Sequence, residues 1–113
     1  MHELSIVMSI IEIAEENAKK ANASVITEIE LEIGTQSGVV REALDFAFES
    51  AKTGTMLEKA KWVIHEIMAL ARCTSCRHEF ETADLFTPCP KCGNPFSDIF
   101  QGKELRVKSL KVE

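Results

Sequence analysis

Residues 25–34 read VITEIELEIG. Its apolar residues alternate with Glu28, Glu30 and Glu32, and a period of two is typical of a strand with one buried face. Gly34 ends the alternation and therefore marks the end of the predicted strand. The pattern predicts a strand that packs one side on a core and turns an acidic side towards water.

Helical periodicity flanks this strand on both sides. Apolar residues recur at spacings of three and four over residues 4–20, and a second such pattern opens at Ser37 or Gly38 and is closed or closely followed by Gly54. The predicted buried stripe of the first helix comprises Leu4, Val7, Met8, Ile11, Ala14 and Ala18. That of the second helix comprises Val40, Ala43, Leu44, Ala47 and Ala51. We therefore expect two amphipathic helices that pack on a sheet.

Two further strands are expected later in the chain. Residues 62–71 are apolar on both alternating faces, so a central strand of the sheet is predicted there. Residues 103–112 form the last predicted strand, and a slip in their alternation indicates a bulge near Lys108 and Ser109. The order of elements indicates an α+β fold, with two helices on a three-stranded, mostly antiparallel sheet and a small lobe inserted before the last strand.

The inserted lobe, residues 73–100, contains all four cysteines and all three prolines, and no regular period persists in it. Two C-x-x-C pairs, Cys73 with Cys76 and Cys89 with Cys92, can supply a tetrahedral shell of four sulfurs. Such a shell suits zinc, whereas iron in the same shell would be a one-electron centre. Two disulfides or four free thiols are the alternatives, and the expected reducing compartment favours metal binding.

A closed four-sulfur shell leaves no open coordination position, so the zinc would be structural and its binding would fold the lobe. Four aromatic residues are expected to pack around the sulfurs as a small core: Phe80, Phe86, Phe96 and Phe100. We interpret His78 as a surface residue, with a place near the metal or as an alternative ligand left open. The predicted organisation is an α/β domain over residues 1–72, completed by the strand 101–113, and a zinc-binding lobe over residues 73–100.

The first three residues, Met1, His2 and Glu3, form a second candidate metal site. We expect Met1 to be retained, since the residue after it is large. The free α-amine, the His2 amide nitrogen and the imidazole can then form five- and six-membered chelate rings around square-planar Ni(II) or Cu(II). The positive end of the following helix opposes a cation, and the Glu3 carboxylate offsets that effect. The alternative is a terminal Met-His pair with no metal role. His65 is interpreted as a hydrogen-bonded or half-exposed strand residue.

Composition restricts the classes of function. The chain has 113 residues, a mass of 12.6 kDa and a formal net charge of −5 without a long basic run, which disfavours nucleic-acid binding. No apolar run reaches the roughly 20 residues of a membrane-spanning helix and no secretory signal is recognisable, so we expect a cytoplasmic protein. No H-E-x-x-H motif, nucleophile–base set or glycine-rich phosphate loop is present, so we do not expect an enzyme.

The sequence Met1-His2-Glu3-Leu4-Ser5, the αβαβ body and the pattern C-x-x-C…C-P-x-C-G before a final strand together resemble the hydrogenase maturation nickel-chaperone family, HypA. The resemblance covers essentially the whole chain. It implies that Met1, His2 and Glu3 bind nickel as transported cargo and that Cys73, Cys76, Cys89 and Cys92 bind structural zinc. Some members appear to use a further histidine near the end of the lobe, and residues 94–98 contain none here.

The resemblance also implies partners. They are a nickel-binding GTPase of hydrogenase maturation and the large subunit of nickel–iron hydrogenase, with urease served by related proteins in some bacteria. We expect a monomer or weak homodimer that binds neither nucleic acid nor membrane. The main alternative is a zinc-ribbon adaptor for a protein or nucleic-acid partner, and a second is a rubredoxin-like electron carrier.

Overall fold

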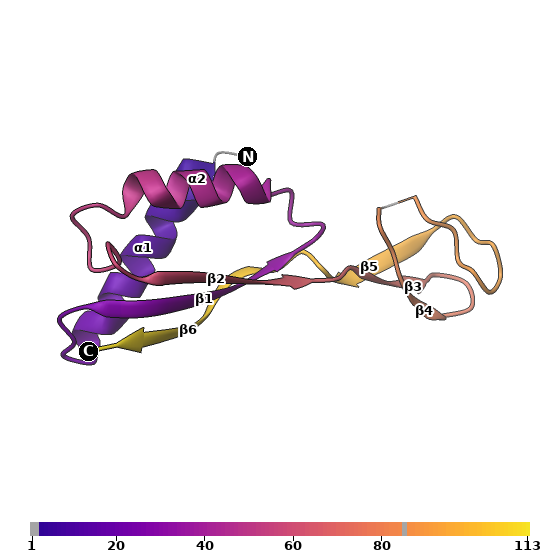
Figure 1. The fold of residues 1–113 in the computed structure, drawn as a ribbon. Coiled ribbons are helices and arrows are strands. Elements are labelled where there is room, and N and C mark those ends of the chain that lie inside the picture. The colour runs from indigo at the N-terminus through magenta and orange to yellow at the C-terminus, as the bar shows by residue number, and fades with distance from the viewer. Residues whose placement is uncertain (1–2, 85) are drawn as a thin grey trace. The chain divides into compact units, whose positions relative to one another are not determined.

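The computed structural model describes residues 3–84 and 86–113, and their contacts divide the chain into two compact units. The helical unit comprises residues 3–32, 39–65 and 106–113; the cysteine unit comprises residues 33–38 and 66–105. The elements are α1 (Glu3–Lys20), β1 (Ile26–Gly34), α2 (Arg41–Ala51), β2 (Lys61–Ile67), β3 (Leu70–Cys73), β4 (Glu79–Glu81), β5 (Ser97–Gln101) and β6 (Leu105–Val112) (Figure 1). No helix among the described residues is long and apolar enough to span a membrane.

The first sheet has the strand order β2-β1-β6, so β1, with its alternating apolar and acidic residues, is the central strand. Backbone bonds in both directions between Val25 and Glu113, with N···O distances of 3.0 and 3.2 Å, join the start of β1 to the end of β6. Figure 1 shows β1 and β2 running in the same direction, because α2 carries the chain back between them. The predicted α+β fold, with two helices on a three-stranded sheet, is confirmed.

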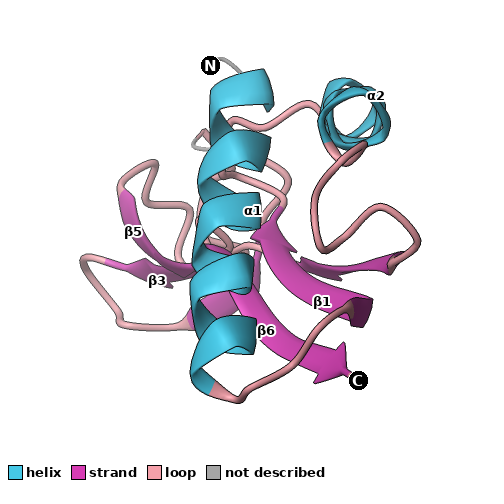
Figure 2. Cartoon of the chain, turned by 90° about the vertical axis from the view of Figure 1, so that its left-hand side faces the viewer, coloured by secondary structure: helices cyan, strands magenta, loops and turns pink. Residues whose placement is uncertain are grey.

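Helix α1 has nearly the predicted bounds but a different buried stripe. Its buried residues are Val7, Ile10, Ile11, Ala14 and Ala18. The predicted burial of Leu4 and Met8 is wrong, since 51% and 58% of their surfaces are exposed. At about 100° per residue these two side chains turn away from the stripe. They line a cavity of about 360 Å³ beside the small residues Ala51 and Thr55 instead. Figure 2 shows α1 crossing the sheet with α2 beside its N-terminal end.

Helix α2 begins at Arg41, a few residues later than predicted. The predicted burial of Val40 is wrong: this residue precedes the helix and 59% of its surface is exposed. Phe48, which the predicted stripe omits, is almost fully buried, and its ring stacks on Trp62 with 4.0 Å between centroids. The indole nitrogen of Trp62 donates to Asp45 Oδ1 at 2.8 Å. One aromatic pair and one hydrogen bond therefore fasten α2 to β2.

The single central strand predicted over residues 62–71 is wrong. The segment forms β2, an edge strand, and β3, which belongs to the second sheet. At the break, the Met68 carbonyl accepts from Gln101 Nε2 at 3.1 Å, and the Ala69 carbonyl accepts from the Thr82 nitrogen at 3.0 Å. Alternation continues through such a change of partners, so the sequence pattern cannot reveal it.

The second sheet, of order β4-β3-β5, is antiparallel and lies within the cysteine unit. Neither β4 nor β5 was predicted, since three- and five-residue strands are too short to show a period. Close backbone packing accompanies this sheet. A Cβ on Gly102, whose φ is +111°, would overlap Ala69, and a Cβ on Gly34 would overlap the Gly102 carbonyl. Only glycine fits these two positions.

The acidic face of β1 is paired rather than simply solvated. Lys111 Nζ lies 3.0 Å from Glu28, Arg106 Nε lies 2.7 Å from Glu32, and Ser109 Oγ donates to Glu30 at 2.7 Å. The two cations and the hydroxyl donor all come from β6. The bulge near Lys108 and Ser109 stays a prediction.

His65 on β2 approaches the same acidic face. Its Nε2 lies 3.7 Å from Glu30 Oε1, and 42% of its side chain is exposed. The interpretation of His65 as a half-exposed strand residue is therefore confirmed. Together with the pairs from β6, this contact gives the acidic face of β1 neighbours on both of its sides.

Candidate metal centre

The structure brings the four cysteines together. Their Sγ atoms all lie within 4.8 Å of one another, with 3.5 Å between Cys73 and Cys92 and 3.6 Å between Cys76 and Cys89. A disulfide would require about 2.05 Å, so the four cysteines form no disulfide. Tetrahedral zinc with Zn–S bonds of about 2.3 Å sets neighbouring sulfurs roughly 3.8 Å apart. The cluster therefore suits a structural zinc site.

Two similar turns position the sulfurs. The Arg77 nitrogen donates to the Cys73 carbonyl at 3.1 Å, and the Gly93 nitrogen donates to the Cys89 carbonyl at 2.8 Å. Both donors follow a C-x-x-C pair directly and have positive φ, 63° for Arg77 and 77° for Gly93. Each turn thus spans five residues and directs its two sulfurs towards one point.

Polar hydrogens surround the Cys73 sulfur. The backbone nitrogens of Cys76 and Ser75 each lie 3.4 Å from it, and Asn94 Nδ2 lies 3.6 Å from it. The Cys76 N–H, followed by that of Ser75, lowers the pKa of Cys73 to about 6 in spite of burial. Sequence reasoning missed Asn94. The signal that could have indicated it is an amide side chain directly after the C-P-x-C-G sequence of residues 89–93.

The other thiols show why the cluster needs a cation. The Asn94 backbone N–H lowers the pKa of Cys92, but the neighbouring sulfurs, Cys73 first, and burial raise it to about 11 overall. Burial opposes ionisation of Cys89, yet the backbone N–H groups of Cys92 and Lys91 lower its pKa. Four thiolates so close repel one another, and a divalent cation removes that repulsion. The donor set therefore fits zinc.

The predicted aromatic core of the lobe is wrong for three of its four members. Phe80 is 8% exposed, whereas Phe86, Phe96 and Phe100 are 83%, 72% and 45% exposed. The buried cluster consists of Ala71, Cys73, Phe80 and Cys89, with Ile99 packed against it. Cys73 and Cys89 make up half of this small buried cluster, whereas Cys76 and Cys92 are exposed, so the interior of the unit has little room for further rings.

His78 contacts the first cysteine turn through its backbone carbonyl. Its carbonyl accepts from the Cys73 nitrogen at 2.9 Å, and its partly buried ring stacks on Phe80 with 6.2 Å between centroids. Among residues 3–84 and 86–113, the group of potential metal ligands contains the four cysteines and no histidine. His78, interpreted as a surface residue, is instead partly buried, and it lies outside this group of potential ligands.

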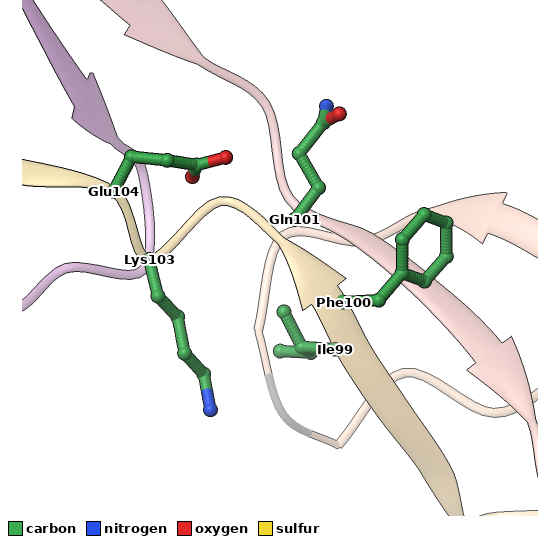
Figure 3. A pocket seen from close by; sticks show the side chains of 5 residues that line it. All are labelled: Ile99, Phe100, Gln101, Lys103 and Glu104. Carbon is green, nitrogen blue, oxygen red and sulfur yellow. The ribbon is translucent and has the colours of Figure 1, made fainter.

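A pocket of about 290 Å³ also lies in the cysteine unit, lined by Ile99, Phe100, Gln101, Lys103 and Glu104 (Figure 3). Glu104 Oε1 accepts from the Gly102 nitrogen at 2.6 Å, so this carboxylate stabilises the turn before β6. The Phe100 ring lies under the Arg72 guanidinium, 4.8 Å from its carbon. Among residues 3–84 and 86–113, no group of three or more potential metal ligands lies in this pocket.

Met1 and His2, the principal residues of the predicted N-terminal site, lie outside the described residues. Glu3 is the first residue of α1, and its Oε2 accepts a hydrogen bond from the Val40 nitrogen at 3.2 Å. Val40 lies directly before α2, so the structure links the predicted nickel-binding segment to the start of the second helix. Sequence reasoning missed this link, because an apolar residue carries no sign of such a contact.

A family model described as hydrogenase/urease nickel incorporation, metallochaperone, HypA matches residues 1–112. The chain belongs to the HypA family. The hydrogenase maturation factor HypA of Parabacteroides distasonis is 49% identical over 113 residues, covering 100% of this chain and 98% of that relative. The corresponding HypA of Geobacter metallireducens is 44% identical, with complete coverage of both chains.

Solved HypA structures share the fold. The solution structure of the Ni metallochaperone HypA from Helicobacter pylori is 32% identical, with a TM-score of 0.71 over 99% of this chain and 97% of that one. A second HypA solution structure is 32% identical, with a TM-score of 0.73 over 100% and 97% of the two chains. HypA membership favours a nickel role over the zinc-ribbon adaptor and the electron carrier.

Proposed function

We propose that this HypA chain binds Ni(II) at its N-terminal segment, Met1, His2 and Glu3, and delivers it to nickel–iron hydrogenase during maturation. The observation that carries the proposal is the family match, which begins at residue 1 and so includes the N-terminal motif. The family description also names urease, and urease is a second client in this proposal. Nickel is the cargo of the protein and not a resident cofactor.

The chemistry of the N-terminal segment supports binding and release. The α-amine, the His2 amide nitrogen and the imidazole suit a square-planar or tetragonal nickel ion. The amide nitrogen binds only after losing its proton, so nickel affinity should rise with pH. A chain end can exchange its donors one at a time, which lets an incoming ligand of the client displace them stepwise.

The zinc site has a separate, structural role in this proposal. Cys73, Cys76, Cys89 and Cys92 hold zinc, which folds the lobe of residues 73–100, while residues 1–72 and the strand 101–113 form the nickel-binding domain. The clustering of the four sulfurs within 4.8 Å supports this assignment. The four-sulfur set leaves the zinc no open position, so the lobe contributes no catalytic group.

The proposal includes the setting in which the protein acts. It works in the cytoplasm, as a monomer or weak homodimer, and without catalytic activity of its own. Its partners are the nickel-binding GTPase of hydrogenase maturation and the hydrogenase large subunit. Family membership supports hydrogenase maturation as the process these partners share.

Nickel titration of the untagged, zinc-loaded protein tests the N-terminal site. We expect one high-affinity nickel ion in the wild type, and loss of that affinity both in His2→Ala and in a variant with residues added before Met1. The lobe provides the control, because bound zinc should stay at one equivalent in all three proteins. Equal nickel affinity in the wild type and His2→Ala would refute the N-terminal site.

A further inference from the structure

The carboxylate of Glu3 serves as the cap of a helix to which it does not belong. The N-cap residue of α2 is Val40, with φ −85° and ψ 112°. Its side chain makes no capping hydrogen bond. Its carbonyl accepts the first helical bond, from the Leu44 nitrogen at 3.0 Å. Its own N–H points to Glu3 Oε2, 3.2 Å away. A residue 37 positions earlier in the chain therefore completes the start of α2.

This contact also brings two helix N-termini together. Glu3 lies in the first turn of α1 and at the start of α2, and both ends carry partial positive charge. Figures 1 and 2 agree in placing the N-terminal end of α1 beside α2. One carboxylate thus neutralises two helix ends that would otherwise repel a dication in their vicinity.

The consequence for nickel follows from chain length. Consecutive Cα atoms are about 3.8 Å apart, so the two residues before Glu3 reach at most roughly 7.6 Å from it. Nickel donors on those two residues therefore stay within this reach of Glu3. A restraint on Glu3 is a restraint on the nickel donors.

We propose that the Glu3 side chain is a positioning residue, which clamps the start of α1 to the Val40 N–H and so orders the nickel-binding segment, and is not itself a nickel donor. This inference rests on the proposed nickel function of the N-terminus. By linkage, nickel binding in turn stabilises the clamp and the first turn of α2. Because 59% of the Val40 surface is exposed, nickel loading is thereby reported at a solvent-accessible helix end.

A second clamp of the same chemistry supplies a matched control. Glu15, three turns further along α1, accepts from the Met56 nitrogen at 3.0 Å, beyond the C-terminal end of α2. Both bonds join an α1 carboxylate to a backbone N–H beside α2. Only the Glu3 clamp lies next to the nickel-binding segment, so only its loss should affect nickel.

The test compares Glu3→Ala, Glu3→Gln and Glu15→Ala in the untagged, zinc-loaded protein. Glutamine keeps an oxygen that accepts from Val40 but is a poor metal donor. We expect Glu3→Ala to weaken nickel binding about five- to tenfold, the factor for loss of one typical helix cap. Glu3→Gln should restore affinity to within about threefold of wild type with an unchanged nickel absorption spectrum, and Glu15→Ala should bind as the wild type does.

Hydrogen exchange of the Val40 amide in nickel-free protein tests the clamp independently of nickel. Exchange should be slow in the wild type and Glu3→Gln and faster in Glu3→Ala. Equal exchange in all three, or an equal loss of nickel affinity with a shifted spectrum in both Glu3 variants, would overturn the inference. Failure of the nickel site itself is recognised separately, by undiminished nickel binding in His2→Ala.

Discussion

The helical unit and the cysteine unit are stabilised by different kinds of interaction. The buried residues of the helical unit are all apolar: Val7, Ile10, Ile11, Ala14, Ala18, Ile26, Ile29, Leu31, Leu44, Ala47, Phe48, Leu57 and Ala60. In the cysteine unit the buried cluster has four members, and two of them are Cys73 and Cys89. One unit therefore depends on burial of hydrocarbon, at about 1.5–3 kcal/mol for each large side chain. The other depends on its sulfurs and the cation they suit.

In the cysteine unit, a metal site takes the place that an apolar core has in the helical unit. Three phenylalanines of the cysteine unit remain exposed although a small unit would gain from burying them. The cluster of sulfurs already fixes the turns and the ends of β3 and β5. In the helical unit, by contrast, Phe48 is buried and joins α2 to β2. The two units should accordingly respond to different perturbations.

The largest effect is expected from Cys89→Ser. Structural zinc contributes on the order of 10–16 kcal/mol in small zinc domains, so one of four ligands accounts for roughly two to three orders of magnitude in zinc affinity. NMR spectra should lose dispersed signals from residues 66–105 and keep those of the helical unit. Chelation of zinc from the wild type should give the same spectrum.

The control for this substitution is Ser75→Ala. Ser75 lies in the first cysteine turn, but it contributes its backbone N–H to the Cys73 sulfur and not its hydroxyl. Zinc affinity should stay within a few-fold of wild type. If Cys89→Ser left the signals of the cysteine unit dispersed, the idea that the cation replaces a core there would be wrong.

The complementary experiment is Phe48→Ala in the helical unit. Phe48 is 1% exposed and stacks on Trp62, so its truncation should lower the free energy of unfolding by about 3–5 kcal/mol. Phe46 is the matched control, because it lies on the same helix and is 75% exposed, and its truncation should cost under about 0.5 kcal/mol. Denaturant unfolding of the zinc-loaded proteins measures both values.

Zinc affinity distinguishes the two units in these variants. It should be unchanged in Phe48→Ala as long as the protein is folded. A loss of zinc that accompanied the loss of stability would show that the apolar core also maintains the sulfur cluster. The two units would then not be stabilised by separate means.

The two units also differ in how well sequence predicts them. Periodicity identified β1 and both helices, and C-x-x-C spacing identified the ligands that the structure brings together, because both patterns are local. Burial of Phe48 and exposure of Leu4 depend on the angle at which α1 and α2 pack, which is not local. The clamp from Glu3 to Val40 joins residues 37 positions apart through a backbone N–H, and backbone groups leave no trace in a sequence.

The two units should also respond differently to acid. In the cysteine unit, protons compete with the metal for the sulfurs, so zinc affinity should fall as pH decreases. In the helical unit the sensitive group is Glu30, where the hydrogen bond from Ser109, followed by the charge of His65, keeps the pKa below its ordinary value of 4.5. A lowered pKa in the folded state stabilises the fold above about pH 4.5, and this contribution is lost as the pH falls through the folded-state pKa.

Ser109→Ala should therefore have the smallest effect, and a specific one. Without the hydroxyl, the pKa of Glu30 should rise towards 4.5, and the acid-induced loss of stability of the helical unit should become shallower. NMR titration of the Glu30 carboxyl carbon measures the pKa directly. Arg106→Gln is the control, because Arg106 pairs with Glu32 on the same face and should leave Glu30 nearly unchanged. If the pKa of Glu30 stayed low in Ser109→Ala, the hydroxyl would not be its principal cause. The contrast in acid response would then depend on His65 and the neighbouring lysines instead.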